Sequence, residues 1–342
     1  MPALNKSKLF LILSALMVML ALAILLTLFF GPAEVQINFS LLKEQFLALV
    51  KSEPMSQSGA IIFRIRVPRA LLAALVGGGL AIAGVGFQAL LRNPLADPYI
   101  LGVSGGSAFF AIIGMILAGS IGFAPVPGFA FAGALIAIAL VLLVARTEGR
   151  LPVITLLLAG VVVNAFFSAL VMFILSISST RHLPGAIYWM MGNLSEKSYS
   201  TLAFVALYYA PAIAILLSRA RDFNLLSLGE ESAEQLGVKV EHSKLWTFLS
   251  ASLITAVAVS VSGLIGFVGL MVPHILRLIF GPDHRLLLPA SFLFGASFLV
   301  LCDLLARVII APAELPVGVI TAVLGGPFFI WLLHSSREKL GK

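Results

Sequence analysis

Long uninterrupted runs of apolar residues recur along the whole chain and alternate with short polar or charged segments. A helix of about 18 residues or more is long enough to cross a hydrocarbon core of roughly 30 Å. The apolar residues are continuous rather than alternating, so they predict helices and not the strands of a membrane barrel. Helices also satisfy their own backbone hydrogen bonds in lipid. The pattern predicts an all-α integral membrane protein with about ten transmembrane helices, over residues 9–30, 67–91, 99–119, 128–145, 153–176, 200–219, 246–263, 267–280, 286–306 and 315–334.

Three segments between these helices are expected to lie outside the membrane span of a single transmembrane domain, residues 1–342. Residues 31–62 would form a periplasmic loop with an amphipathic piece on the membrane surface. Residues 177–199 contain LPGAIYWMMG, which is too short to span and predicts an outer re-entrant or interfacial helix. Residues 220–245 form a long polar loop, expected on the cytoplasmic side. Within it SLGEESAEQLG has helix signals, with Ser227 as a possible N-cap, acids in the first turn and a glycine stop.

Composition excludes a soluble protein. Hydrophobic residues make up 60% of the chain, charged residues only 11%, and the mean hydropathy is +1.10. A soluble domain carries about a quarter charged residues. The first apolar run is longer than the core of a typical signal peptide and no small-residue cleavage site follows it, so we expect a retained helix.

The distribution of basic residues predicts orientation. With the N-terminus inside, 14 of the 22 lysine and arginine residues fall in cytoplasmic segments, which favours cytoplasmic N- and C-termini. The net charge of +7 comes from residues that punctuate helices. It does not come from a basic patch with interleaved aromatics, so no nucleic-acid partner is predicted.

No catalytic constellation is recognisable. The chain lacks a G-x-x-x-x-G-K-[ST] loop and should not bind ATP by that route. It also lacks a nucleophile elbow and an H-E-x-x-H motif. The five histidines are scattered and Cys302 is the one cysteine, so neither a metal site nor an internal disulfide is predicted. We expect a protein that is not an enzyme and holds no cofactor.

Asp303 is the clearest carboxylate within a predicted span, four residues before Arg307. The pair could neutralise itself on one helix face. The alternative is a proton-relay aspartate, as in secondary transporters. The relay is disfavoured because no second buried acid accompanies Asp303.

Eight motifs in order carry a resemblance to the FecCD-type permease subunits of type II ABC importers, which include the cobalamin, ferric-siderophore and haem permeases. The resemblance covers about residues 64–333. The motifs are R-x-P-R (66–69), QALLRNPLADP (88–98), LGVSGG (101–106), TLLLAG (155–160), YWMMG (188–192), LGEESAEQLGV (228–238), GFVGLMVPHILR (266–277) and AELPVG (313–318).

The resemblance implies a ten-helix subunit that pairs with a second copy of itself around a central path within membrane lipid. Two ABC ATPase subunits, which would hold ATP and Mg, are expected on the cytoplasmic side and a periplasmic substrate-binding protein outside. The expected cargo is a bulky metal chelate. A ferric siderophore is the first candidate, because it is the commonest cargo of the resembling family, and cobalamin or haem are alternatives.

By the same resemblance, the helix in the polar loop would couple to the ATPase. Two glycines would frame it, two glutamates would face polar groups, and an alanine and a leucine would pack. The alternative is a solvated linker helix with favourable charge at its N-terminus. The implied coupling residues are Leu228, Gly229, Glu230, Glu231, Ala233, Leu236 and Gly237.

Three outer arginines, Arg66, Arg69 and Arg307, would receive carboxylates of the binding protein by the same resemblance. Charge pairing of this kind gives orientation and fast encounter more than affinity. The alternative for all three is contact with lipid headgroups. Arg307 could instead pair with Asp303 or Glu314.

The resemblance also implies a cytoplasmic gate at Asn93, Leu95, Val153 and Ile154. The last two depart from the small hydroxyl residues of the cobalamin permease, but apolar side chains can gate by dewetting. The alternative for the Asn-Pro pair at 93–94 is an ordinary helix-ending turn.

Two other classes of protein compete with this hypothesis. An ion-coupled secondary transporter would need more buried acids, and an intramembrane enzyme would need polar residues converging at mid-membrane. His274 and Arg277 lie at a span end with nothing evident to converge with them.

Overall fold

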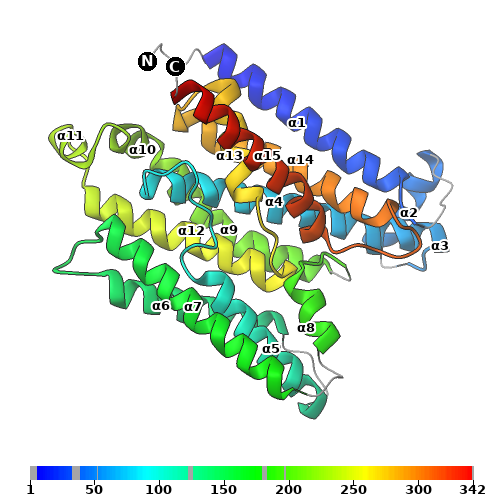
Figure 1. Cartoon of the computed structure of the whole chain (residues 1–342). Helices are drawn as coiled ribbons and strands as arrows, with labels where there is room; N and C mark the ends of the chain where they lie inside the picture. Colours follow the sequence, from blue (N-terminus) through cyan, green and yellow to red (C-terminus); the bar gives the residue numbers. More distant parts are fainter. Residues whose placement is uncertain are drawn as a thin grey trace.

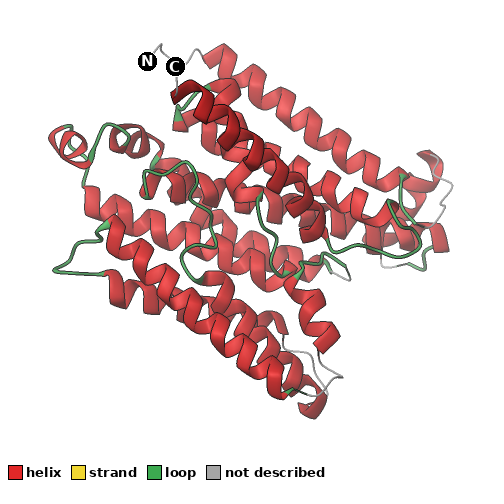
Figure 2. Cartoon of the chain, viewed as in Figure 1, coloured by secondary structure: helices red, strands yellow, loops and turns green. Residues whose placement is uncertain are grey.

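Helices form nearly all of the structure, a computed structural model that describes residues 6–32, 39–51, 53–121, 126–178, 183–195 and 198–340. Within these ranges Figure 2 shows helices joined by loops and no strand. The prediction of an all-α protein is confirmed.

Seven helical segments are long and apolar enough to cross a membrane. They are α1 (Lys6–Phe29), α4 (Val67–Leu90, which continues α3 and the π-helical turn η1), α6 (Val126–Ala145), α7 (Val153–Ile177), α9 (Tyr199–Ser218), α12 (Val240–Ser262) and α14 (His284–Val308). Three more helices have shorter apolar stretches, namely α5 (Val103–Ile121), α13 (Val268–Phe280) and α15 (Val317–Leu340). Each of the ten predicted spans corresponds to one of these helices.

Shorter helices lie within the three segments that were predicted to be non-spanning. The described part of 31–62 contains α2 (Phe39–Lys51) and α3 (Gln57–Ala60), but α3 and the following η1 (Ile61–Arg66) are continuous with α4, so this long helix begins before the predicted start at residue 67. The LPGAIYWMMG piece forms α8 (Leu183–Met190). The polar loop contains α10 (Ala220–Leu226) and α11 (Glu230–Gln235).

Helix α12 differs from the prediction, because it begins at Val240, six residues before the predicted span. Hydropathy identifies only the residues that prefer lipid. It therefore does not show that this helix continues beyond the apolar span into the polar loop. That extension adds a first turn carrying Glu241 and Lys244 to the end of the bundle.

The start of α1 and the end of α15 lie at the same end of the bundle as α10 and α11 (Figure 1). The helices α2, α3 and α8 lie toward the opposite end. We call these the α11 end and the α8 end. The predicted orientation requires both termini on the same side as the polar loop, and this arrangement has that property.

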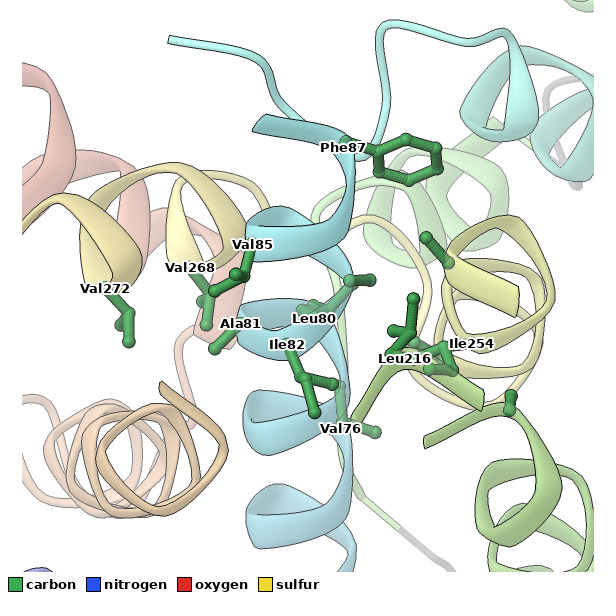
Figure 3. Close-up of a cluster of buried hydrophobic side chains, with 14 of the residues drawn as sticks. Val76, Leu80, Ala81, Ile82, Val85, Phe87, Leu216, Ile254, Val268 and Val272 are labelled. Carbon is green, nitrogen blue, oxygen red and sulfur yellow. The ribbon is translucent and has the colours of Figure 1, made fainter. Parts of the chain in front are cut away.

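Helix α4 is the centre of the core and is buried along nearly its whole length. It packs against α14, α12, α13 and α9. In Figure 3 its side chains face Val268 and Val272 of α13 on one side and Leu216 and Ile254 on the other. An all-round apolar helix is stable only when neighbours cover every face.

Glycines allow this close packing. A Cβ added to Gly84 of α4 would overlap the backbone carbonyl of Gly269 on α13, and one added to Gly77 would overlap that of Gly295 on α14. Absence of a side chain lets helix backbones approach closely in membranes. These glycines of α4 therefore serve packing within the subunit.

We expect Gly84→Ala to destabilise the protein by about 1–3 kcal/mol, because the new methyl group must push α13 away from α4. The measurement is the thermal unfolding midpoint in detergent. Gly128→Ala on α6 is the matched control, because no atom lies within 4 Å of its added Cβ and alanine favours a helix by about 1 kcal/mol. Equal midpoints for the two variants would contradict the packing argument.

Candidate functional site

Two glycines bound the short helix α11 at the end of the polar loop. Gly229 precedes it with φ 113° and Gly237 follows it with φ 85°, both conformations that side chains disfavour. At the C-terminal end the Val238 amide donates to the Ala233 carbonyl at 3.0 Å, a bond that satisfies a helix end. The prediction that glycines frame this helix is confirmed.

The predicted N-cap is wrong. The residue before α11 is Gly229 rather than Ser227, and the Ser227 hydroxyl instead donates to the carbonyl of Asn224 at 2.7 Å. The hydroxyl completes a local turn after α10, so the sequence preference of serine for helix starts is overridden by a neighbouring carbonyl.

The faces of α11 differ in exposure. Ala233 is fully buried, whereas Leu228 and Leu236, which flank the helix, are 62% and 53% exposed. Glu231 is exposed to solvent. Glu230 is half-buried and makes ion pairs with Arg92 at 3.6 Å and Lys244 at 3.1 Å. The helix thus presents two leucines outward and is held to the bundle by Ala233 and Glu230.

The segment after α4 contains the first pair of predicted gate residues. Arg92 has a left-handed φ of 48°, and the Asn93 amide donates back to the carbonyl of Gln88 at 3.1 Å. The Asn93 side chain then accepts the Leu95 amide at 2.9 Å. These bonds end the helix, as the alternative interpretation proposed. Asn93 and Leu95 are nonetheless exposed, so their side chains remain available for a gate.

The second pair lies at the start of α7, where Val153 is half-buried and Ile154 is exposed. Two of the three apolar predicted gate residues, Leu95 and Ile154, therefore lie on the surface of the single chain. The gate itself stays a prediction.

Beyond Leu95 the chain continues without helix to α5, and a second non-helical segment, residues 263–267, precedes α13. The Tyr99 hydroxyl joins them: it donates to the Ile265 carbonyl and accepts the Ile265 amide, both at 3.0 Å. Irregular backbone within a membrane protein needs such internal partners. The Asp97 carboxylate accepts the Tyr99 amide at 2.8 Å, and its burial raises the pKa of Asp97 to about 6.

Gln88 connects the end of α4 to α13. Its side-chain oxygen accepts a hydrogen bond from Arg277 at 2.8 Å. Both residues line a cavity of about 310 Å³, together with Arg92, Asn93 and His284. Arg277, for which the sequence suggested no partner, therefore contacts the neutral amide of Gln88. This hydrogen bond holds α13 against the end of α4.

The α8 end contains a buried network of four charged side chains, Arg69, Asp303, Arg307 and Glu314. Arg69 of α4 pairs with Asp303 of α14 at 2.9 Å and with Glu314 at 2.8 Å. Arg307 pairs with the same aspartate at 3.0 Å. Ser195, which follows α8, donates to Glu314 at 3.2 Å. The two positive and two negative charges balance, as buried charges require.

The three predicted docking arginines are therefore not free on the surface. Arg66, Arg69 and Arg307 are 3%, 7% and 4% exposed. Arg66 donates to the carbonyl of Leu28 on α1, and Arg307 forms the aspartate pair that was its alternative. The docking role of the three arginines stays a prediction. It has to explain how side chains that are buried in the single subunit could contact a binding protein.

The sequence does not reveal the full extent of two charge networks, the one at the α8 end and the one around Glu230 and Lys244 at the α11 end. Glu314 entered only as an alternative partner of Arg307, and Lys244 and Ser195 had no assigned role. The signal for Glu314 was its place in the AELPVG motif. Nothing local predicted that Arg69 contacts a residue 234 positions away.

We expect Asp303→Asn to destabilise the protein by about 3–5 kcal/mol, because it leaves two buried guanidinium groups with one remaining carboxylate. Thermal unfolding in detergent measures the change. Glu148→Gln, which removes an exposed carboxylate, should leave the midpoint unchanged. An unchanged midpoint for Asp303→Asn would show that the network does not stabilise the α8 end.

The sequence profile of the FecCD transport family matches residues 19–335. The chain is 45% identical over 279 residues to the cobalamin import system permease protein BtuC of Halobacterium salinarum. This alignment covers 82% of this chain and 74% of that protein. It is 40% identical over 308 residues to the hemin transport system permease protein HmuU of Yersinia pestis, covering 88% and 91%.

A solved structure, an inward-facing conformation of a metal-chelate type ABC transporter, has the same fold. It superposes with a TM-score of 0.81 at 34% identity, covering 95% of this chain and 99% of the other. Most of the chain, including both charge networks and α11, falls within the matched family region. The chain belongs to the FecCD transport family and is an ABC importer permease.

Proposed function

We propose that this chain is the membrane-spanning subunit of an ATP-driven importer that moves a bulky metal chelate from the periplasm across a bacterial inner membrane into the cytoplasm. A ferric siderophore is the first candidate cargo, with cobalamin or haem as alternatives. The relatives that carry cobalamin and hemin in their names support the chelate class. The chain itself would not hydrolyse ATP.

The observation that carries this proposal is the form of α11. Its two flanking leucines are exposed beside a helix that lies at one end of the bundle, and the predicted orientation places that end outside the lipid tails. Burying a leucine contributes about 1.5–3 kcal/mol, and a short helix with outward apolar residues fits a groove on a soluble protein. We assign that groove to one of two ABC ATPase subunits, which would bind ATP and Mg.

A second copy of the chain would complete the path. On the single chain, Leu95 and Ile154 are exposed rather than enclosed. Exposed apolar residues continue along α7 at helical spacing, through Leu158, Val162 and Phe166. Part of this face would contact the partner copy and part would line the path, with the predicted gate residues where the two copies approach.

The periplasmic binding protein would dock at the α8 end by exchanging carboxylates. Of the two acids in the network, Glu314 is the accessible one, with its side chain 27% exposed against 1% for Asp303. An acidic side chain of the binding protein could displace Glu314 and pair with Arg69. Burial of the arginines in the undocked subunit is then consistent with their use in docking.

The same network argues against an ion-coupled secondary transporter. A proton-relay carboxylate has to be reachable along a proton path, whereas the Asp303 side chain is 1% exposed and paired with two guanidinium groups. Its oxygens are therefore occupied by structural ion pairs.

The function is tested by uptake into proteoliposomes that contain the permease, its ATPase and its binding protein. We expect ATP-dependent uptake that Leu236→Asp reduces about tenfold or more, because a charge replaces the apolar contact with the ATPase. Leu236→Met is the matched control and should retain uptake. Uptake driven by an ion gradient without the ATPase would overturn the proposal. Parallel assays with a ferric siderophore, cobalamin and haem identify the cargo.

Carboxylate exchange predicts the effect of Glu314→Gln. Removing the internal competitor should strengthen binding of the binding protein to the reconstituted permease several-fold, with a larger effect at low salt. Calorimetry or surface plasmon resonance measures this affinity. Weaker binding would indicate that Glu314 itself contacts the binding protein, and equal binding would exclude exchange at this site.

A further inference from the structure

Charged side chains join α11 to both segments that contain the predicted gate residues. Glu230 of α11 contacts Arg92 at 3.6 Å on one side and Lys244 at 3.1 Å on the other. Arg92 directly precedes Asn93. This ion pair, which we call the first arm, therefore connects α11 directly to the gate segment after α4.

The second arm passes through α12 to the start of α7. The Lys244 ammonium contacts Glu241, three residues earlier on α12, at 2.6 Å. The other oxygen of Glu241 accepts the backbone amide of Leu151 at 2.6 Å. Leu151 lies two residues before Val153, so Glu241 holds the chain that leads into the second gate segment.

Lys244 is the centre of this cluster. Its side chain is 3% exposed and its ammonium bridges two carboxylates, Glu230 and Glu241. A buried ammonium cannot exchange these partners for water without a large desolvation cost. The link between α11 and α12 is therefore stiff, unlike a surface ion pair, in which water readily replaces the partner.

Removal of the lysine charge would have a defined consequence. Glu230 and Glu241 would then face each other across the vacated position with no cation between them. Like charges at short range repel, so α11 and the start of α12 would separate. Arg92 would still pair with Glu230, but the connection from α11 to Leu151 would be lost.

We propose that Lys244 is a positioning residue that makes the second gate segment, at the start of α7, follow the movement of α11. Glu241 completes this connection through the Leu151 amide, while the Glu230–Arg92 ion pair separately joins α11 to the first gate segment. Displacement of α11 by the ATPase would then reach Val153 through Lys244 and Asn93 through Arg92. This inference rests on the proposed function, because it requires α11 to contact an ATPase.

The test compares transport with ATP hydrolysis in the complete reconstituted transporter. In Lys244→Met, which keeps the length of the side chain and removes its charge, we expect ATP hydrolysis near the wild-type rate. Cargo molecules transported per ATP should fall at least tenfold. Lys244→Arg retains a cation between the two glutamates and should restore most of the ratio. A lysine that merely stabilised the fold would lower both activities together.

Arg92→Gln is the second variant, because the Arg92 side chain is exposed and its replacement should not prevent folding. It interrupts only the arm to Asn93. This ion pair is longer and more exposed than the contacts of Lys244, so Arg92→Gln should lower the transport-to-ATP ratio less than Lys244→Met. If folded Lys244→Met keeps the wild-type ratio, or if it fails to fold and Arg92→Gln keeps the wild-type ratio, the inference is overturned. Failure of the wild-type complex to show ATP-dependent uptake would instead refute the proposed function.

Discussion

The absence of water within a bilayer is the constraint on which the rest of this structure depends. Every backbone polar group and every charge at membrane depth must find its partner in the protein. Helices meet the backbone requirement along α4, which is buried almost throughout. Where the chain leaves the helical form before α5 and α13, the Tyr99 hydroxyl bonds both backbone groups of Ile265. The irregular segments are thus stabilised by each other.

The same constraint explains why charged side chains collect in balanced groups at the two ends of the bundle. At the α8 end, Arg69 and Arg307 share Asp303. At the α11 end, Lys244 lies between two glutamates. Charge balance makes such groups tolerable inside protein, and their location at helix ends means that each joins several helices. Moving or replacing one charged residue of a group therefore affects every helix that the group connects.

Packing between these ends is close and leaves little room for the helices to move independently. The glycine contacts of α4 with α13 and α14 leave no side chain between the backbones, and close-packed interiors have low compressibility. A rigid middle with charged clusters at both ends suits a transporter in which partners act from opposite sides. The proposed binding-protein and ATPase contacts both lie on elements joined by these clusters.

The sequence by itself determined the membrane class, the ten helices and the C-terminal boundary of α11, because lipid demands continuous apolar residues and because a glycine marks that helix end locally. Its motifs also identified the family. Tertiary structure alone decided the burial of the outer arginines and the partners of Lys244. Arg69 pairs with an aspartate 234 positions away. Of the two carboxylates that Lys244 contacts, Glu241 lies on the same helix and Glu230 lies on α11. Hydropathy measures each residue's own preference for lipid, whereas charge pairing depends on which helices the fold brings together.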